Sequence, residues 1–148
     1  MTQSSPVTAV VIDTMAISAL INPNRRGADG AAYRDLIGGR VILVSFVTVT
    51  ELRYGTLKAG WGELRRRGLE RDLARFAVVQ PDDALMQVCA TLRAGCELDG
   101  HGLGHKIHEA DRWIAATALR LRIPLISDDS IFFGIDELVV ESRGKRPG

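Results

Sequence analysis

Short apolar runs alternate with amphipathic segments along the chain, and this alternation constrains the fold more than any other feature. The runs cover residues 7–12, 41–45, 77–79, 123–126 and 138–140. The first two are apolar at nearly every position, which is typical of strands buried on both faces. Strands that alternate with helices form a parallel sheet with helices on both faces. We therefore predict an α/β fold of three layers, with a central parallel sheet of about five short strands.

The segments between these runs carry helix signals. Asn22-Pro23 ends the first helix, and acidic residues open the helix that follows Pro81. We expect helices over 14–21, 29–37, 47–59, 62–76, 82–98 and 109–121, the fourth interrupted at Gly68, and a loop over 99–107.

Length and composition fit one globular domain. The chain has 148 residues, of which 46% are hydrophobic and 25% charged. We predict a single domain over 1–148 with its core at about 9–140. The basic tail at 142–148, which contains Arg143, Lys145 and Arg146, is expected to be disordered.

Charge and hydropathy exclude some classes of protein. The net charge of +1 gives no global attraction to nucleic acid or membrane, although 16 of the 19 basic residues are Arg. Arg suits bidentate phosphate contacts, but a GC-rich genome gives the same bias. The N-terminus lacks the basic and long apolar parts of a signal peptide, and no stretch reaches the length of a membrane span. We expect a cytoplasmic protein.

Cysteine and histidine do not indicate a zinc site. Cys89 and Cys96 are seven residues apart in one predicted helix, where they would share a buried face. The sequence also has His101, His105 and His108, but intervening glycines at 100, 102 and 104 argue against the helix that would align them. His108 lies near the acids discussed next and could instead contact phosphate.

Four acids occupy informative positions. Asp13 directly follows the first predicted strand, and Asp129 nearly follows the fourth. Ligands of open α/β sheets bind at the carboxyl ends of the strands, so these two carboxylates can converge. Glu51 lies on the helix that leaves the second strand, and Asp111 lies in the first turn of the helix before the fourth strand.

Converging carboxylates repel one another unless a cation lies between them. Oxygen ligands suit Mg²⁺, with Mn²⁺ as a substitute, and such ions activate water for phosphodiester hydrolysis. The structural alternative is that Asp13 and Asp111 cap helices and that Glu51 is a solvated helix residue.

The residues around these acids resemble a known family. Residues 10–20 (VVIDTMAISAL), 45–55 (SFVTVTELRYG), 108–118 (HEADRWIAATA) and 125–132 (LISDDSIF) are similar, in order and spacing, to the four motifs of PIN-domain endoribonucleases of the VapC toxin type. The resemblance implies RNA cleavage, toxin function in a toxin–antitoxin pair, homodimerisation and inhibition by a VapB-type antitoxin that inserts a segment into the site.

The resemblance also implies site residues. The acidic, metal-binding quartet would be Asp13, Glu51, Asp111 and Asp129. Supporting roles would fall to Thr14 and Thr48, which orient ligands or waters, to Ser127 in the Asp129 turn, and to Glu109, which could hold a second ion. Two features depart from the pattern: Met15 replaces a polar residue, and Asp128 competes with Asp129 for the fourth acidic position.

Basic residues offer candidate contacts. Arg65, Arg66, Arg67, Arg71 and Arg75 form a run that is a solvated helix face or a surface for the RNA backbone. Arg112, next to Asp111, could contact substrate phosphate or an antitoxin carboxylate. Trp61 and Trp113 are expected to be packing anchors.

Other functions remain possible at this point. An aspartyl-phosphate phosphatase needs a second Asp two residues after the first, where Met15 stands. A response-regulator receiver needs an early acidic pair and a late Lys, an order that this chain lacks. A catalytically weak RNA- or protein-binding module of PIN fold is the main alternative.

Overall fold

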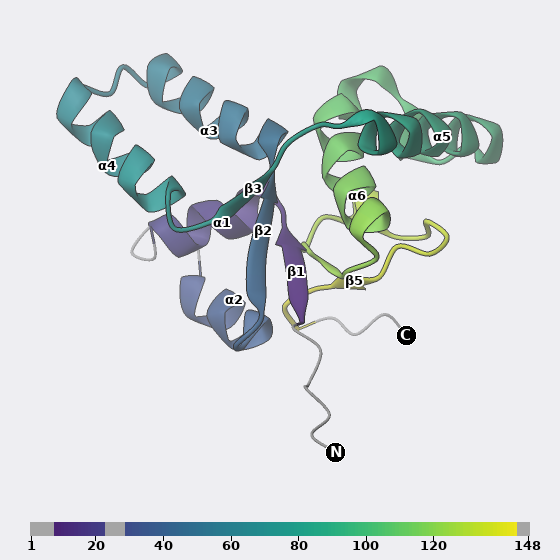
Figure 1. Cartoon of the computed structure of the whole chain (residues 1–148), viewed down its shortest axis with the longest axis horizontal. Helices are drawn as coiled ribbons and strands as arrows, with labels where there is room; N and C mark the ends of the chain where they lie inside the picture. The colour runs from purple at the N-terminus through teal and green to yellow at the C-terminus, as the bar shows by residue number, and fades with distance from the viewer. Residues whose placement is uncertain (1–7, 23–28, 145–148) are drawn as a thin grey trace.

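The computed structural model describes residues 8–22 and 29–144 (Figure 1). Its centre is a five-stranded, entirely parallel sheet with the order β3-β2-β1-β4-β5. The strands are β1 (Ala9–Ile12), β2 (Val41–Ser45), β3 (Ala77–Val79), β4 (Leu125–Ile126) and β5 (Val140–Glu141). The prediction of about five short parallel strands is confirmed.

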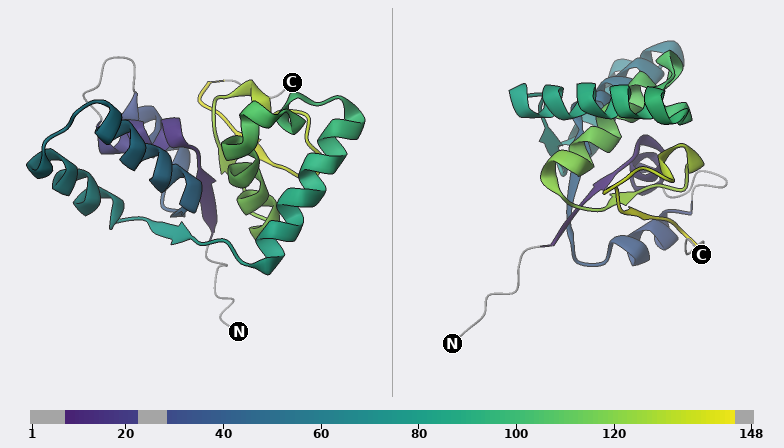
Figure 2. Two further views of the ribbon diagram at one scale, coloured as in Figure 1. Left: turned by 90° about the horizontal axis from the view of Figure 1, so that it is seen from above. Right: turned by 90° about the vertical axis from the view of Figure 1, so that its right-hand side faces the viewer.

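In the described part of the chain, six α-helices surround this sheet: α1 (Thr14–Ile21), α2 (Gly30–Ile37), α3 (Phe46–Lys58), α4 (Glu63–Leu73), α5 (Asp83–Asp99) and α6 (Glu109–Leu121). Short 3-10 helices η1 (Gly102–Gly104), η2 (Lys106–His108) and η3 (Ser130–Phe132) connect the C-terminal elements. Figure 2 shows α1 and α2 on one side of the sheet and α5 and α6 on the other, with α3 and α4 extending as an antiparallel pair.

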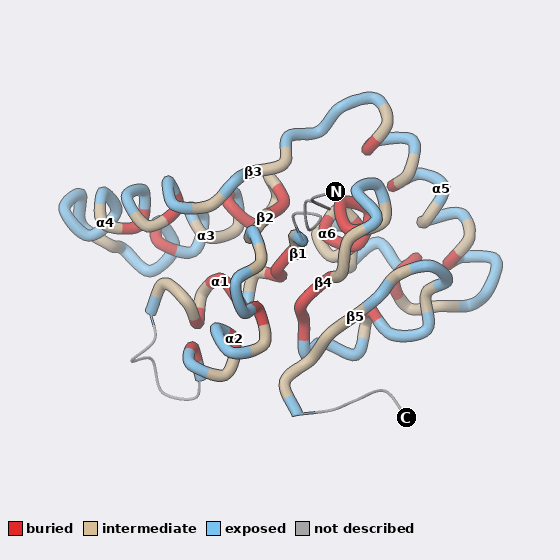
Figure 3. The backbone as a smooth tube through the Cα atoms, turned by 60° about the horizontal axis from the view of Figure 1, so that its bottom comes forward, coloured by how far each residue is buried: buried red, intermediate tan, exposed pale blue. Residues whose placement is uncertain are grey.

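The side chains of β1 divide the core between these two sides. Val10 and Ile12 pack in a cluster with residues of α1, α2 and α4, whereas Val11 packs with residues of α6. All three are fully buried, and Figure 3 shows β1 and β4 as buried segments inside an exposed shell. Alternate strand residues point to opposite faces, so a continuous apolar run supplies both layers of core.

A third cluster joins α5 to α6 and α3. Cys89 and Leu85 pack there against Ala116, and the rings of Phe46 and Trp113 meet edge to face at 5.2 Å. Cys96 is buried in the cluster behind the sheet, and both cysteines are free. The predicted buried thiols and the packing role of Trp113 agree with this arrangement.

Some local predictions differ from the structure. Helix α4 continues through Gly68, because Leu69 and Leu73 are buried on one face and hold the helix together. The predicted loop at 99–107 begins with the last residue of α5 and includes η1 and the first two residues of η2. Val7 and residues 145–148 lie outside the described part of the chain. No helix of the described residues is long and apolar enough to cross a membrane.

Candidate active site

Asp13 lies at the carboxyl end of β1 and caps helix α1. Its Oδ1 accepts a hydrogen bond from the Ala16 N–H at 2.8 Å, and its Oδ2 accepts one from the Ser127 hydroxyl at 2.5 Å. Only 5% of the residue is exposed. Burial raises the pKa of Asp13, as do the negative charges of Asp129 and Asp128, against the two hydrogen bonds, which lower it. Asp13 is therefore both a helix cap and a carboxylate that neighbouring acids repel.

Ser127 links the first strand to the fourth. Ile12 and Ile126 are register partners in β1 and β4, so the residues that follow them lie side by side. The Ser127 hydroxyl donates to Asp13 and accepts the Asp129 N–H at 3.0 Å. Asp129 then caps η3, because its Oδ1 accepts the Ile131 N–H at 3.0 Å. The predicted role of Ser127 in the Asp129 turn agrees with these contacts.

Glu51 lies on α3 and faces the same group of acids. Its pKa is raised by burial first, then by the negative charge of Asp111, and further by that of Asp13. A side-chain hydrogen bond with Thr14 acts in the opposite direction. The Thr14 hydroxyl also bonds to the Thr48 hydroxyl, with 3.2 Å between the oxygens. The structure thus brings Glu51 into electrostatic reach of acids from β1 and α6, with both predicted threonines beside it.

Asp111 stands in the first turn of α6 and contacts a histidine. Its Oδ2 lies 2.9 Å from Nδ1 of His108, and about a third of the Asp111 side chain is exposed. His101 has a different role: its Nδ1 accepts the Leu103 N–H, so its Nε2–H donates to the Phe133 carbonyl at 2.6 Å. His101 and His108 thus have separate partners.

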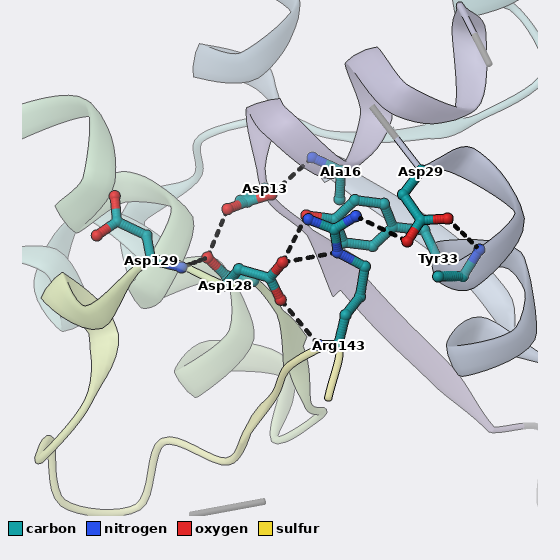
Figure 4. Close-up of polar contacts among 9 residues, drawn as sticks. Asp13, Ala16, Asp29, Tyr33, Asp128, Asp129 and Arg143 are labelled. Carbon is teal, nitrogen blue, oxygen red and sulfur yellow. Dashed lines mark hydrogen bonds and ion pairs between the residues drawn. The ribbon is translucent and has the colours of Figure 1, made fainter. Parts of the chain in front are cut away.

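Asp128 lies near Asp13, but its carboxylate is bound by other residues of the protein. Its carboxylate is held by Arg143, whose backbone N–H and Nε donate at 2.8 and 2.6 Å, and by the Tyr33 hydroxyl at 3.3 Å. Figure 4 shows the side chains of Asp128 and Asp129 on opposite sides of their turn. Arg143 is thus fixed in place, which corrects the expectation that the tail is disordered from residue 142 onward.

Of two predicted contacts on α6, the one assigned to Arg112 is wrong and the one assigned to Glu109 is not tested. Arg112 is only 2% exposed and donates to the carbonyl oxygens of Leu103 and His105, at 3.0 and 2.6 Å. It therefore holds the turns before α6 and cannot meet substrate or an antitoxin without unfolding them. Burial raises the pKa of the Cys89 thiol, and the negative charge of Glu109 raises it further. A role of Glu109 at a second ion site stays a prediction.

The remaining candidates lie on the surface. Met15 is 71% exposed beside the acids. On α4, Arg67 pairs with Glu63 at 2.6 Å, and the Arg65 guanidinium lies 3.8 Å above the Trp61 ring. These contacts favour the solvated helix face over a dedicated RNA surface.

Tyr33 is a residue of this region that the sequence did not indicate. It is almost fully buried in α2, and burial together with the charge of Asp128 raises its pKa to about 12. Its hydroxyl is a donor at neutral pH. No local motif marks it, because its partners Asp128 and Arg143 are about one hundred residues away along the chain.

Could these residues hold a metal ion? Within 8–22 and 29–144, no three His, Cys, Asp or Glu side chains already surround a single point. The donor chemistry nevertheless suits a hard cation, because Asp13 and Glu51 are carboxylates whose charges are opposed by burial and by neighbouring acids. A cation between such acids relieves their repulsion, and hard divalent cations prefer oxygen ligands. The donor set is therefore suited by chemistry and charge to a hard divalent cation.

Comparison with known families decides the classification. The sequence profile of the PIN domain matches residues 10–138. The chain belongs to the PIN-domain family. The resemblance stated from the four motifs is confirmed, and this PIN domain has the three-layer fold expected of it.

Related proteins include a named ribonuclease. Ribonuclease VapC5 from Mycobacterium tuberculosis is 29% identical over 135 residues, which cover 90% of this chain and 92% of that protein. The solved VapBC-5 structure from Mycobacterium tuberculosis, a member of the VapBC family of toxin–antitoxin systems, has a TM-score of 0.64 at 27% identity and covers 93% of this PIN domain and 98% of that chain.

A more distant relative shares the fold. VapBC2 from Rickettsia felis, bound to a DNA fragment from their promoter, has a TM-score of 0.73 at 21% identity, with 91% of this chain and 98% of that chain covered.

Proposed function

We propose that this PIN domain is a metal-dependent endoribonuclease of the VapC toxin type, which hydrolyses phosphodiester bonds in RNA. The observation that carries the proposal is that Glu51, Asp111 and Asp13, which come from three elements of the fold, lie near enough for the two aspartate charges to raise the pKa of Glu51 in addition to burial. The relationship to a ribonuclease over nearly the whole length of both chains supports the substrate class.

The proposed metal ligands are Asp13, Glu51, Asp111 and Asp129, with Mg²⁺ as the ion and Mn²⁺ as a substitute. When bound, such an ion lowers the pKa of a coordinated water and stabilises negative charge at phosphorus. The protein keeps the ligands in place: Ala16 N–H and Ser127 fix the Asp13 carboxylate, Thr14 bonds to Glu51, and His108 bonds to Asp111. Fixed ligands bind metal and substrate with less loss of conformational entropy.

The proposed partners follow from the same relationship. We infer that a VapB-type antitoxin inhibits the enzyme and that the active form is a homodimer in the cytoplasm. The solved VapBC-5 structure, which is 27% identical to this chain, supports the antitoxin partner. A growth test addresses the toxin role, since expression should arrest growth and the product of the neighbouring upstream gene should relieve the arrest.

The direct test measures RNA cleavage by the purified protein. We expect products with Mg²⁺ or Mn²⁺, none in excess EDTA, and none from Asp13→Asn or Asp111→Asn, which remove a charge at nearly constant shape. Asp99→Asn, an exposed acid at the end of α5, is the matched control and should cut normally. Equal cleavage in EDTA would refute the metal mechanism.

A catalytically weak binding module is the second candidate, and the exposed Met15 in place of a polar residue is the observation that favours it. Its signature is retention of RNA without metal and without product on a gel. Met15→Asn distinguishes the two, because a gain of cleavage would assign the weakness to that position.

A further inference from the structure

The turn after β4 presents two consecutive acids with different surroundings. The Asp128 carboxylate accepts three hydrogen bonds, two from Arg143 and one from Tyr33 (Figure 4). The Asp129 carboxylate accepts only the Ile131 N–H among the described residues. A carboxylate has about four lone-pair positions, so Asp128 is largely occupied by protein donors and Asp129 is largely available.

Arg143 is fixed from several directions. Its guanidinium lies 4.2 Å above the Tyr33 ring and 3.5 Å from the Asp29 carboxylate, in addition to its 2.6 Å contact with Asp128. Its side chain is only 24% exposed. A charge-assisted bond, a backbone bond and a cation–π contact together restrain one side chain more than a surface ion pair does. We call Asp128, Arg143 and Tyr33 the Asp128 latch.

The latch matters because Asp128 lies close to the acids of the site. In addition to burial, the negative charges of Asp129 and Asp128 raise the pKa of Asp13. A released Asp128 carboxylate would carry its full charge, without its cation, beside a group that already repels it. It would also compete with Asp129 for any cation bound there.

We propose that Arg143 and Tyr33 are positioning residues that hold Asp128 out of the acidic site, so that Asp129 is the acid which this turn contributes. The inference rests on the proposed function for its catalytic consequence, whereas the latch itself can be tested without cleavage. It gives the segment after β5 a role in the site, although Arg143 is 130 positions from Asp13 in sequence.

The cleavage test uses Arg143→Ala, Asp128→Asn and the double variant. Arg143→Ala should lower the cleavage rate by roughly tenfold, because the released Asp128 charge competes with Asp129 for the cation. Asp128→Asn alone should have little effect. In the Arg143→Ala background, Asp128→Asn should restore cleavage, because it removes the competing charge. A merely structural role for Arg143 predicts no such rescue.

Arg40→Ala is the matched control. Arg40 donates two hydrogen bonds to Glu141, so it anchors the same C-terminal segment to α2 without touching Asp128. Its loss should leave cleavage nearly unchanged, and Asp128→Asn should not improve it. Thermal melts must show that each variant is folded at the assay temperature.

Two readouts do not depend on cleavage. Mn²⁺ binding, followed by electron paramagnetic resonance, should be retained in Asp128→Asn and weakened about ten- to hundredfold in Asp129→Asn. In urea unfolding, the double variant should be no less stable than Arg143→Ala alone, because either change breaks the same contact.

Three results would overturn the inference. The first is a loss of Mn²⁺ in Asp128→Asn as large as in Asp129→Asn, which would make Asp128 the ligand. The second is a folded double variant that cuts no better than Arg143→Ala. The third is additive loss of stability in the double variant. If the wild-type protein cuts no RNA, the proposed function fails, but Mn²⁺ binding and unfolding still decide on the latch.

Discussion

Replacing Asp13 by Asn separates the stability of the metal-free protein from its activity. Asp13 is buried, and its charge is opposed by burial and by Asp128 and Asp129, which together raise its pKa. At neutral pH the ionised side chain therefore costs free energy of folding when no cation is bound. Asn keeps an oxygen to accept the Ala16 N–H and is as good a helix cap as Asp.

The expected effect is a gain in stability. Asp13→Asn loses the charge-assisted hydrogen bond from Ser127, which favours the ionised carboxylate. Burial disfavours the ionised carboxylate more strongly, because it is the largest cause of the raised pKa of Asp13. We expect the free energy of unfolding to rise by about 1 kcal/mol, within the range seen when a strained functional residue is relieved. For a chain of this size that is about 3 °C in Tm.

The effect also has a defined dependence on pH. Because the pKa of Asp13 is raised above its ordinary value of 3.8, the folded state binds a proton there more tightly than the unfolded chain does. The contribution of Asp13 to stability is fully present below that ordinary value and is lost as the pH rises through the raised pKa. The advantage of Asp13→Asn should therefore be greatest near neutral pH and should shrink as the pH falls toward 3.8.

Urea unfolding in EDTA measures the free energies of unfolding of the wild-type protein and of Asp13→Asn. Repeating the measurement with Mn²⁺ provides the control. The wild-type protein should gain stability from the ion by mass action, and Asp13→Asn should gain much less. A variant less stable than wild type in EDTA at neutral pH would refute the argument that the Asp13 charge is costly in the folded state.

Three further predictions concern contacts around the site. Ser127→Ala removes the hydroxyl that bonds to both Asp13 and the Asp129 N–H, so the free energy of unfolding in urea titrations should fall by about 2 kcal/mol. An unchanged value would contradict a stabilising role for these two bonds. Arg112→Met leaves two backbone carbonyl oxygens without their donor and should cost about 2 kcal/mol by the same measurement, whereas the exposed Arg120→Met should change stability by less than about 0.5 kcal/mol. Gly104→Ala places a Cβ 2.9 Å from a backbone nitrogen of α5 and should lower the free energy of unfolding by about 1–3 kcal/mol. At Gly95 an added Cβ meets no atom within 4 Å, so Gly95→Ala should be neutral or stabilising. Similar melting temperatures for the two variants would contradict the close approach at Gly104.

The fold was predictable because the apolar pattern of each segment matches the burial of that segment in the folded protein. The continuous apolar run at 9–12 supplies side chains to both layers of core, and only a strand between two helical layers can bury all of them. Gly68 was misjudged for a related reason. A single glycine costs a helix about 1 kcal/mol, and burial of Leu69 and Leu73 offsets that amount.

The closeness of Asp13 to the turn after β4 was predictable because parallel strands end at the same edge of the sheet. The register of β1 with β4 then places Asp13 beside Ser127. Arg112 was misassigned because neighbours in sequence are not neighbours on a helix. Successive residues point about 100° apart, so Asp111 can face the acids while Arg112 faces the turns at 103–105.

The Asp128 latch could not be predicted from local sequence. Its three members lie in α2, after β4 and after β5, and no spacing rule connects them. The sequence shows two adjacent acids of equal chemistry. Only the position of Arg143, which depends on the pairing of β5 with β4, distinguishes one from the other.

The hydrogen bond between Ser127 and Asp13 spans 114 positions of the chain and has a consequence for biosynthesis. A ribosome adds about 5–20 residues per second, so the N-terminal acid waits on the order of ten seconds for the partner that fixes it. Until that partner has left the exit tunnel, the emerging polypeptide holds carboxylates but no assembled catalytic centre. An RNA-cutting enzyme with this connectivity becomes active only late in its own translation.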